Sequence, residues 1–310
     1  FGLLLGTRLL MGLAEGGIMP VSQSMIATEV SPAHRGLAMG VAQGFGSSLM
    51  GSFVAPVLLV AFATWFGWRE AFFLAGAPGL LMAFLMAWLI RGTPELKRAV
   101  TKNAANTGGA VREVLSDGNV LRCAAIGVLL VSYLVVCWAF MPLFLTQVRG
   151  YDPETMGWLM GALGISATLA STLIPALSDR IGRKPMMILM PMMAIILPLG
   201  ALFYTSSVWI LAAIFFTGWT VTGVFPLFMA TIPSESIKAT HIPLTLGICM
   251  GTSEILGGVL SPIIAGSAAD RFGLQAPLWF MLLIAVLSMI VALGLRETAP
   301  RVLAKQAAQA

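Results

Sequence analysis

Long runs of apolar residues, separated by short polar segments, follow one another along almost the whole chain. Each run is long enough to cross a bilayer as a helix, which takes about 20 residues at a rise of about 1.5 Å per residue. Most segments between the runs contain Pro, Gly or charged residues, which interrupt helices. The pattern predicts an all-α polytopic membrane protein with about nine transmembrane helices, at residues 1–26, 36–63, 71–90, 119–146, 156–177, 186–204, 208–231, 243–266 and 275–295.

One segment between two apolar runs is longer and more polar than the others. Residues 91–118 carry several charges and the pair Gly108-Gly109, a composition that is typical of a linker between two helical bundles. The sequence therefore predicts three helices at 1–90, a linker at 91–118, a bundle of six helices at 119–296 and a tail at 297–310.

The composition agrees with a membrane protein. Of the 310 residues, 58% are hydrophobic and 10% are charged, and the mean hydropathy is +0.92. A soluble domain carries about 25% charged residues because its surface must face water. The three cysteines, Cys123, Cys137 and Cys249, lie in apolar runs without the spacing of metal ligands, so we interpret them as buried hydrophobic residues. We therefore expect no metal and no cofactor.

The positive charges fall mainly on one side of the predicted membrane. Of the 18 Lys and Arg residues, only Arg69, Arg149 and Arg271 lie on the opposite side, and Arg8 lies within a helix. Cytoplasmic segments of membrane proteins are enriched in Lys and Arg. This bias predicts a protein of the cell inner (plasma) membrane whose 91–118 linker and C-terminus are cytoplasmic. The net charge of +5 is thus an orientation signal, and we expect no nucleic-acid partner.

An internal repeat relates the first three helices to the last three. Gly and Pro matches carry the repeat because these residues mark kinks and points of close helix packing. The helices at 119–204 have no counterpart in this chain, so we expect three further helices before Phe1, which gives twelve in two parallel halves. A shift of 206 residues aligns Gly12 with Gly218, Gly17 with Gly223, Pro20 with Pro226, Glu29 with Glu235, Gly51 with Gly257 and Pro56 with Pro262.

Two motifs carry a resemblance to a known family. The segment SDRIGRKP, at 178–185, lies between two predicted helices, and RLLMGLAEGG, at 8–17, lies within the first helix. With two parallel halves and a cytoplasmic linker, the chain resembles the major facilitator superfamily. The first motif is similar to the family's signature cytoplasmic loop, and the second to the helix-4 motif of the anion:cation symporter branch. The resemblance implies a bundle with two pseudo-symmetric halves, of which this chain holds helices 4–12.

The 178–185 segment is interpreted through this resemblance as a conformational latch. A carboxylate at this place can accept hydrogen bonds from backbone N–H groups at a helix end, while the basic side chains pair with acidic groups. A solvated, positively charged loop is the alternative, and it is compatible with the first interpretation. The latch residues are Asp179, Arg180, Gly182, Arg183 and Lys184.

Two charges lie within the first predicted helix. Arg8 and Glu15 are seven residues apart, so they share one helix face about 10 Å apart along the axis. Charges in the hydrocarbon region normally face a cavity or a partner. An Arg offers planar donors that suit a carboxylate, and a Glu in a partly dry cavity can take up and release a proton. We assign substrate binding to Arg8 and proton coupling to Glu15. Their repeat equivalents, Ile214 and Val221, are apolar, so this type of helix packs without charge.

Further polar and aromatic residues within the predicted helices are candidates for substrate binding. Glu254 lies in the middle of a helix and could bind substrate or carry a proton; a buried acid that is hydrogen-bonded between helices is the alternative. The other candidates are Gln43, Ser47, Tyr133 and Trp219. For hydroxyl side chains, a hydrogen bond to the helix's own backbone is the competing interpretation.

These residues favour a secondary active transporter. The leading hypothesis is proton-coupled symport of a small organic anion by alternating access. In it, Glu15 is protonated, the substrate carboxylate docks on Arg8, and the two halves rock. The resemblance to the anion:cation symporter branch implies a sugar acid, a dicarboxylate or an aromatic acid as this anion. We expect a monomer whose partners are this anion, a proton and the lipid bilayer. The alternatives are efflux of a lipophilic or cationic compound and, more remotely, a non-transporting membrane sensor. The sequence holds no catalytic motif, so we expect no enzyme.

Overall fold

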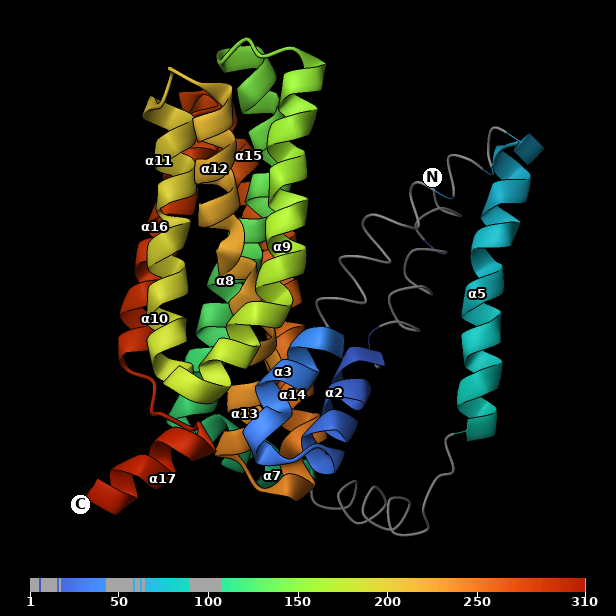
Figure 1. Cartoon of the computed structure of the whole chain (residues 1–310), viewed down its shortest axis with the longest axis vertical. Coiled ribbons are helices and arrows are strands. Elements are labelled where there is room, and N and C mark those ends of the chain that lie inside the picture. Colours follow the sequence, from blue (N-terminus) through green and yellow to red (C-terminus); the bar gives the residue numbers. More distant parts are fainter. Residues whose placement is uncertain are drawn as a thin grey trace.

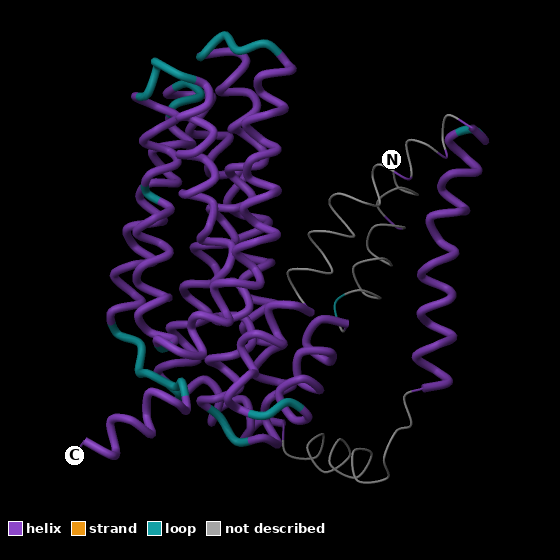
Figure 2. Tube along the Cα trace, viewed as in Figure 1, coloured by secondary structure: helices purple, strands orange, loops and turns teal. Residues whose placement is uncertain are grey.

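The computed structural model describes residues 18–42, 65–89 and 107–309, together with Gly6, Gly16, Leu58 and Phe62. Within this part of the chain every regular element is a helix (Figure 2). The N-terminal elements are α2 (Ile18–Glu29), the 3-10 turn η1 (Pro32–His34), α3 (Arg35–Gly40) and α5 (Trp68–Leu89). The all-α fold that the hydrophobic pattern predicts is confirmed.

The C-terminal part of the chain forms a bundle of long helices that stand side by side (Figure 1). Several of these helices contain a π-helical or 3-10 segment, and prolines such as Pro142 and Pro226 precede two of them. A proline removes a backbone donor and clashes with the preceding turn, which favours such irregular segments. The elements are α7 (Thr107–Ser116), α8 (Gly118–Leu143), η3 (Phe144–Val148), α9 (Pro153–Ile181), α10 (Arg183–Ala194), α11 (Ile196–Phe203), α12 (Val208–Trp219), η4 (Thr220–Val224), η5 (Leu227–Thr231), α13 (Ile232–Ser236), η6 (Ala239–His241), α14 (Ile242–Thr252), η7 (Ser253–Leu260), α15 (Ser261–Phe272), α16 (Ala276–Leu293) and α17 (Pro300–Gln309).

Seven helical segments of the described chain are long and apolar enough to cross a membrane. They coincide with the third to ninth predicted spans, so these predictions are confirmed. The first two predicted spans, at 1–26 and 36–63, lie largely outside the described residues. The seven segments are Arg69–Leu89, Gly118–Val148, Pro153–Ile181, Arg183–Phe203, Val208–Ser236, Ala239–Phe272 and Ala276–Leu293.

The predicted linker contains a helix that the composition did not indicate. Helix α7 occupies residues 107–116 and ends just before α8. The Asp117 carboxylate accepts hydrogen bonds from the backbone N–H groups of Asn119 and Val120, at 2.8 and 3.0 Å, and so caps the N-terminus of α8. The chain therefore enters the C-terminal bundle at a defined point.

Apolar side chains fill the inside of the C-terminal bundle and also cover its outside. Phe215 and Phe228 are fully buried, as are all three cysteines, in agreement with the prediction. On the outer surface Trp209 is 82% exposed and Ile263 is 62% exposed. Side chains of this kind in contact with water would be unfavourable over so large an area. The bundle is a multi-pass membrane domain whose outer face suits lipid.

Helices α2 and α3 lie against one end of the C-terminal bundle, beside α9 and α14, whereas α5 stands apart from it (Figure 1). The approach of α3 to α9 depends on Gly40. A Cβ atom at Gly40 would collide with the carbonyl oxygen of Ser171 and the ring of Pro175. Small residues of this kind let two helix backbones come close together in a membrane.

Candidate functional site: a charge cluster between helix ends

The N-terminus of α3 is capped by a side chain from α9. The residue that precedes α3, His34, makes no side-chain hydrogen bond to the helix. Instead the Asp179 carboxylate accepts hydrogen bonds from the backbone N–H groups of Gly36 and Leu37, at 3.3 and 3.1 Å. A negative charge at this position satisfies donors that have no partner within the helix and interacts favourably with the helix dipole. Asp179 thus joins the N-terminal and C-terminal parts of the chain.

Gly36 is required for this contact. A Cβ atom on Gly36 would lie 2.6 Å from Nη1 of Arg183 and 2.7 Å from Oδ1 of Asp179. Contacts this short do not occur between real side chains, so any larger residue would push the carboxylate away from the helix end. Glycine at the first turn of α3 therefore permits the capping geometry.

Arg183 is the centre of a network of buried charges. Its guanidinium is fully buried and lies 2.5 Å from the Asp179 carboxylate and 3.0 Å from that of Glu235. A second guanidinium N–H also donates to Glu235, at 3.3 Å, so this pair is bidentate. Nη1 further donates to the Ser178 hydroxyl at 2.7 Å. A buried ion pair is stable only when its polar atoms are satisfied in this way.

A third carboxylate holds the turn between α9 and α10. The Glu297 side chain accepts hydrogen bonds from the backbone N–H groups of Arg183 and Lys184, at 2.8 and 3.1 Å. Gly182, at the turn itself, has φ +124°, a conformation that residues with a side chain rarely adopt. A Cβ atom on Gly182 would also lie 2.5 Å from the Glu297 carboxylate. The turn therefore needs glycine twice, for its backbone conformation and for this approach.

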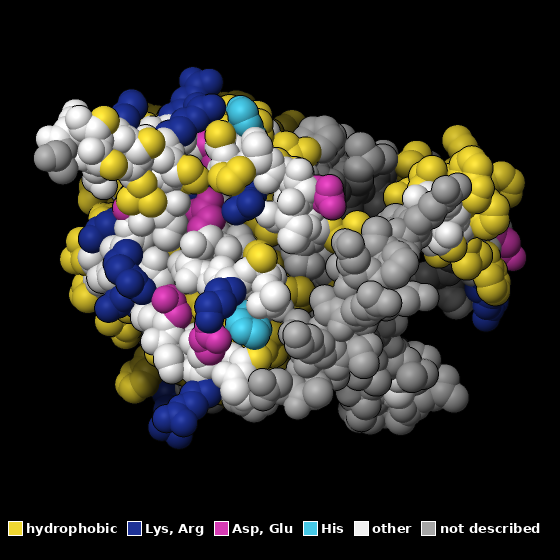
Figure 3. All heavy atoms as spheres, turned by 90° about the horizontal axis from the view of Figure 1, so that it is seen from below, with side chains coloured by type: hydrophobic (Ala, Val, Ile, Leu, Met, Phe, Trp, Pro, Cys, Tyr) yellow, Lys and Arg dark blue, Asp and Glu magenta, His cyan; other side chains and the backbone are white. Residues whose placement is uncertain are grey.

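Together these residues form what we call the charge cluster: Ser178, Asp179, Arg183, Glu235, Glu297 and Thr298. The Thr298 hydroxyl donates to Glu235 at 2.6 Å and so connects the segment after α16 to the rest of the cluster. Lys and Arg side chains are spread over this end of the molecule, with Asp and Glu among them (Figure 3). The carboxylates of Asp179 and Glu235 share the buried Arg183 guanidinium, whereas the Glu297 carboxylate is held by backbone N–H groups. Backbone N–H donors of α3 and α10 offset the excess negative charge.

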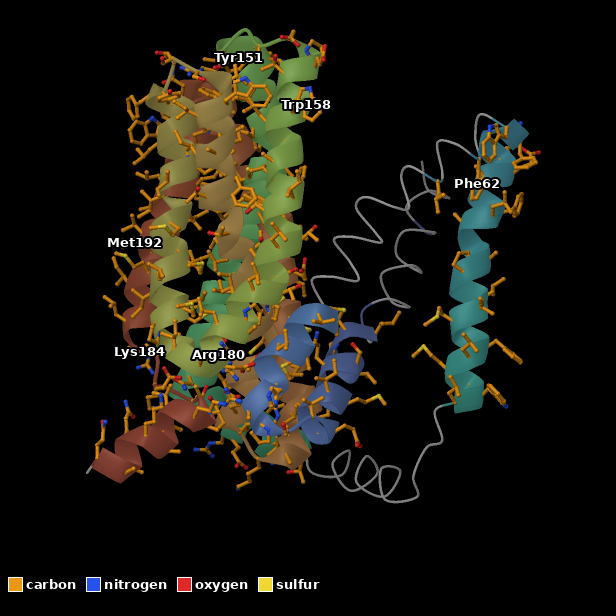
Figure 4. The ribbon with its side chains drawn as sticks, in the orientation of Figure 1. Phe62, Tyr151, Trp158, Arg180, Lys184 and Met192 are labelled. Carbon is orange, nitrogen blue, oxygen red and sulfur yellow. The ribbon has the colours of Figure 1, made fainter. Side chains whose placement is uncertain are left out.

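The predicted latch residues fall into two groups. Asp179, Gly182 and Arg183 belong to the buried network, as described above. The side chains of Arg180 and Lys184 have no ion-pair partner within the described part of the chain, and only the backbone of Lys184 takes part. In Figure 4 both side chains lie at the end of the bundle where α9 meets α10.

Sequence reasoning missed the acidic partners. Glu235 and Glu297 lie about 50 and 110 residues beyond Arg183, and no local motif connects them to it. One signal was present for Glu235, because the internal repeat aligns it with Glu29, and a charge that recurs at equivalent helix ends indicates a shared role. No comparable signal marked Glu297.

A pocket of about 460 Å³ lies beside the charge cluster, between α2 and the C-terminal bundle. Its lining includes Arg35, Glu235 and Thr298. The Nε atom of Arg35 is buried and has no hydrogen-bond partner among the described residues. The interface at this end is thus closely packed around the charge cluster but leaves a hollow next to it.

Two of the predicted substrate-binding residues meet inside the C-terminal bundle. Tyr133 and Trp219 are fully buried with ring centroids 6.1 Å apart, and Trp138 contacts Trp219 edge-on at 6.0 Å. The Tyr133 hydroxyl donates to the Ala194 carbonyl at 2.8 Å, whereas the buried Trp219 indole N–H has no partner in the part of the chain that the structure describes. Trp138 is 45% exposed, so this aromatic cluster reaches the surface of the bundle through one ring.

Glu254 lies in η7, an eight-residue π-helical segment. Such segments are rare and often occur at functional sites. The side chain is exposed, and its carboxylate has no hydrogen bond or ion pair within the described residues. Nearby, Gly257 packs directly on α8, where a Cβ atom would lie 2.6 Å from the Val128 carbonyl oxygen. The role of Glu254 therefore stays a prediction.

Four predicted site residues, Arg8, Glu15, Gln43 and Ser47, lie outside the described residues. Within the part of the chain that the structure describes, no group of three or more His, Cys, Asp or Glu side chains is arranged to hold a metal ion.

Comparison with known proteins agrees with this architecture. Three relatives are a protein named "Probable sulfoacetate transporter" from Cupriavidus necator, a glycine betaine/proline/ectoine/pipecolic acid transporter from Dickeya dadantii, and a 3-(3-hydroxy-phenyl)propionate transporter from Escherichia coli. They are 26%, 25% and 26% identical to this chain over alignments that cover 86%, 96% and 86% of it. The alignments cover 66%, 63% and 64% of the relatives, so the chain spans less than two thirds of their length. A family model described as Major Facilitator Superfamily matches residues 1–152 and 124–310, and the chain belongs to that family.

Proposed function

We propose that this chain is part of a secondary active transporter that carries a small organic anion together with a proton by alternating access. The observation that carries the proposal is the Asp179 contact with the N-terminus of α3, because it joins the two parts of the chain at one end only of the described bundle. Alternating access requires contacts of this kind, which form in one state and break in the other.

The charge cluster is suited to act as a reversible gate. Asp179 is bound on one side to Arg183, within its own half, and on the other to backbone N–H groups of α3. When α3 moves away, the Asp179 carboxylate keeps its guanidinium partner, so opening the interface does not leave an isolated buried charge. The cost of opening is then a few hydrogen bonds, which is small enough for substrate binding to offset.

An organic anion is the substrate class that the sequence and the relatives favour. Two of the relatives carry names that specify acids, sulfoacetate and 3-(3-hydroxy-phenyl)propionate. In this proposal Arg8 binds the substrate's acidic group and Glu15 carries the proton, with Gln43 and Ser47 nearby on the next helix. Trp219, whose ring contacts Tyr133, adds an indole N–H that can donate a hydrogen bond to a substrate oxygen.

A second candidate is transport, including efflux, of a lipophilic or cationic compound. The aromatic cluster favours it, because Trp and Tyr faces attract cations, and Glu254 adds a carboxylate without a partner in the described residues. One relative is named for glycine betaine, which carries a quaternary ammonium group. In this version Arg8 has a structural role, and Glu15 and Glu254 bind the cation.

We also propose the membrane arrangement that the charge bias predicts. The 91–118 linker, the end of the bundle with the charge cluster and the C-terminus face the cytoplasm of an inner-membrane protein. Residues 1–90 belong to an N-terminal bundle and residues 119–296 form a C-terminal bundle. The transporter works as a monomer.

Uptake measurements on cells that express the complete gene encoding this chain test the proposal. Radiolabelled sulfoacetate, 3-(3-hydroxyphenyl)propionate and glycine betaine are supplied with and without a protonophore. We expect one of the acids to be taken up, and we expect the protonophore to abolish this uptake. Arg8→Ala is expected to reduce uptake at least 100-fold. Arg271→Ala, at the end of the C-terminal bundle opposite the charge cluster, is expected to leave it unchanged.

The variant that loses uptake distinguishes between the two hypotheses. Glu15→Gln is expected to remove accumulation driven by a pH gradient while exchange of substrate continues. Uptake that survives Arg8→Ala but is lost with Glu254→Gln would replace the anion hypothesis by the cation hypothesis. Uptake that does not respond to the protonophore would exclude proton coupling while leaving transport in place.

A further inference from the structure

A groove of about 560 Å³ runs along the outer side of α10 and is closed at one end by α17. Beyond its first turn, α10 contributes Ile188, Leu189 and Met192 to the groove, and these follow one another on one side of the helix. Leu189 is 39% exposed and Met192 is 46% exposed. These side chains belong to the membrane-facing surface of the bundle, so the groove opens toward lipid.

The closed end of the groove is basic. Lys184 lines it at the first turn of α10, and its ammonium group has no ion-pair partner within the described residues. Arg180 and Arg301 directly precede Ile181 and Val302, two further residues of the groove wall, and both guanidinium groups are likewise unpaired there. The groove therefore presents positive charge at one end only.

The one acidic residue of the groove does not cancel this charge. Glu297 lines the groove, but its carboxylate already accepts hydrogen bonds from the backbone N–H groups of Arg183, Lys184, Thr298 and Ala299. These four donors offset its charge locally. A negatively charged ligand in the groove would thus meet the Lys184 ammonium group, which has no ion-pair partner within the described residues.

The distances along α10 match a lipid. Lys184 and Met192 are eight residues apart, or about 12 Å along the helix axis. Figure 4 has both on the side of α10 that faces away from α2 and α3, with Lys184 at the end of the helix nearer α17. A molecule in the groove would therefore have an acidic head beside Lys184 and an apolar chain along Ile188, Leu189 and Met192.

We propose that the groove between α10 and α17 binds an anionic phospholipid of the cytoplasmic leaflet, with its phosphate at Lys184 and an acyl chain along α10. The inference rests on the topology proposed above, which places this end of the bundle at the cytoplasmic membrane surface. Basic pockets at this membrane depth are general features of lipid recognition. Because Lys184 lies next to Arg183 in the chain, a bound lipid would also restrain the turn at the charge cluster.

Native mass spectrometry of the purified chain, released from nanodiscs that hold equal amounts of phosphatidylglycerol and phosphatidylcholine, tests the proposal. We expect retained phosphatidylglycerol in excess over phosphatidylcholine. Lys184→Gln is expected to lower phosphatidylglycerol retention about fivefold, the factor that corresponds to about 1 kcal/mol per basic residue near an anionic surface. Arg112→Gln removes an exposed charge at the same end of the bundle outside the groove and is expected to change nothing.

A second variant tests the apolar α10 wall of the groove and leaves its charge unchanged. Met192→Trp fills the groove and is expected to lower retention of phosphatidylglycerol while the thermal unfolding midpoint in detergent stays within a few degrees. Equal retention of the two lipids by the unmodified chain would overturn the proposal. So would equal losses in Lys184→Gln and Arg112→Gln, or a dimer that forms through this groove and excludes lipid.

Discussion

The Asp179 carboxylate accepts a hydrogen bond from the Leu37 backbone N–H at 3.1 Å, although 142 residues separate the two in sequence. The contact is charge-assisted and lies at a helix N-terminus, where a carboxylate is most favourable. Through this contact α9, a long helix of the C-terminal bundle, holds the N-terminus of α3 in place. A change at Asp179 therefore acts on the interface more than on either part by itself.

Asp179→Ala is expected to open the interface between α3 and α9. Hydrogen bonds to a charged group contribute about 1.5–3 kcal/mol, which corresponds to at least about a tenfold increase in the open population. The measurement is the labelling rate of a cysteine at Met39, which is fully buried at this interface, by a membrane-impermeant maleimide. The native cysteines are replaced by serine in all variants.

The matched control for this measurement is Asp152→Ala. Asp152 caps the other end of the same helix by accepting from the Thr155 backbone N–H at 2.8 Å. It is expected to leave labelling at Met39→Cys unchanged. Equal labelling of the Asp179→Ala variant and its parent would mean that the capping contact does not hold the interface closed.

Arg183→Met is expected to destabilise the C-terminal bundle strongly. The change leaves the carboxylates of Asp179 and Glu235 buried without their shared cation, and breaking a buried pair on one side costs about 3–5 kcal/mol. Adding Glu235→Gln removes one of the two charges and is expected to recover part of the loss. Denaturant unfolding in detergent micelles measures both variants.

Arg180→Met provides the comparison for this prediction. Arg180 is exposed and belongs to the same segment, so its loss is expected to change the free energy of unfolding by no more than about 0.5 kcal/mol. If Arg180→Met and Arg183→Met were equally destabilising, the segment would act as a charged loop without a specific network.

Gly182→Ala is expected to destabilise the turn between α9 and α10 by more than about 1 kcal/mol. The backbone there has φ +124°, and the added Cβ atom would collide with the Glu297 carboxylate. Gly161→Ala, inside α9, adds a Cβ atom that meets no described residue within 4 Å and is expected to be neutral or stabilising by up to about 1 kcal/mol. Thermal unfolding midpoints of the two variants check this. A Gly182→Ala variant as stable as the parent would show that the turn can change its conformation freely.

The Glu113–Lys238 ion pair is expected to give a small dependence of stability on pH. A hydrogen bond from Lys238 at 2.8 Å lowers the pKa of Glu113. Because the folded-state pKa lies below the unfolded value of about 4.3, the contribution is present above that pH and is lost as the pH falls through the folded pKa. Lys238→Gln is expected to raise the Glu113 pKa in a carbon-detected NMR titration. The pKa of Asp152, which hydrogen bonds from Thr155 lower, serves as the control and should not move.

The helices were predictable because each depends on its own residues. A backbone in lipid must form its hydrogen bonds internally, so an apolar run of sufficient length becomes a spanning helix almost regardless of its neighbours. The start of α8 at Gly118 and the turn at Gly182 both fell where polar residues and glycine interrupt the apolar pattern. Helix α7 escaped prediction because it is short and mixes apolar with polar residues, and its packing against the start of α8 is not visible in composition.

The site was only partly predictable. Asp179, Gly182 and Arg183 lie within one short segment, so their motif was visible in the sequence. The acidic partners Glu235 and Glu297 come from other helix ends, and Arg180 and Lys184 look equivalent to Arg183 until the packing is known. Burial distinguishes them, because only Arg183 points into the bundle, where a charge requires partners.

The sequence by itself determined that this is a multi-pass membrane protein, and it located the seven spans of the described residues and the charged segment at 178–185. Hydrophobic length and charge placement are local properties, so both can be seen without the fold. The tertiary structure decided which charges meet. Asp179 reaches the α3 N–H groups only because Gly36 and Gly40 allow two helices to pack closely. Arg183 contacts Glu235 only because the start of α10 and the end of α13 lie together at the same end of the bundle. Ion pairs depend steeply on distance and burial, and both quantities arise from the packing of segments that lie far apart in the chain.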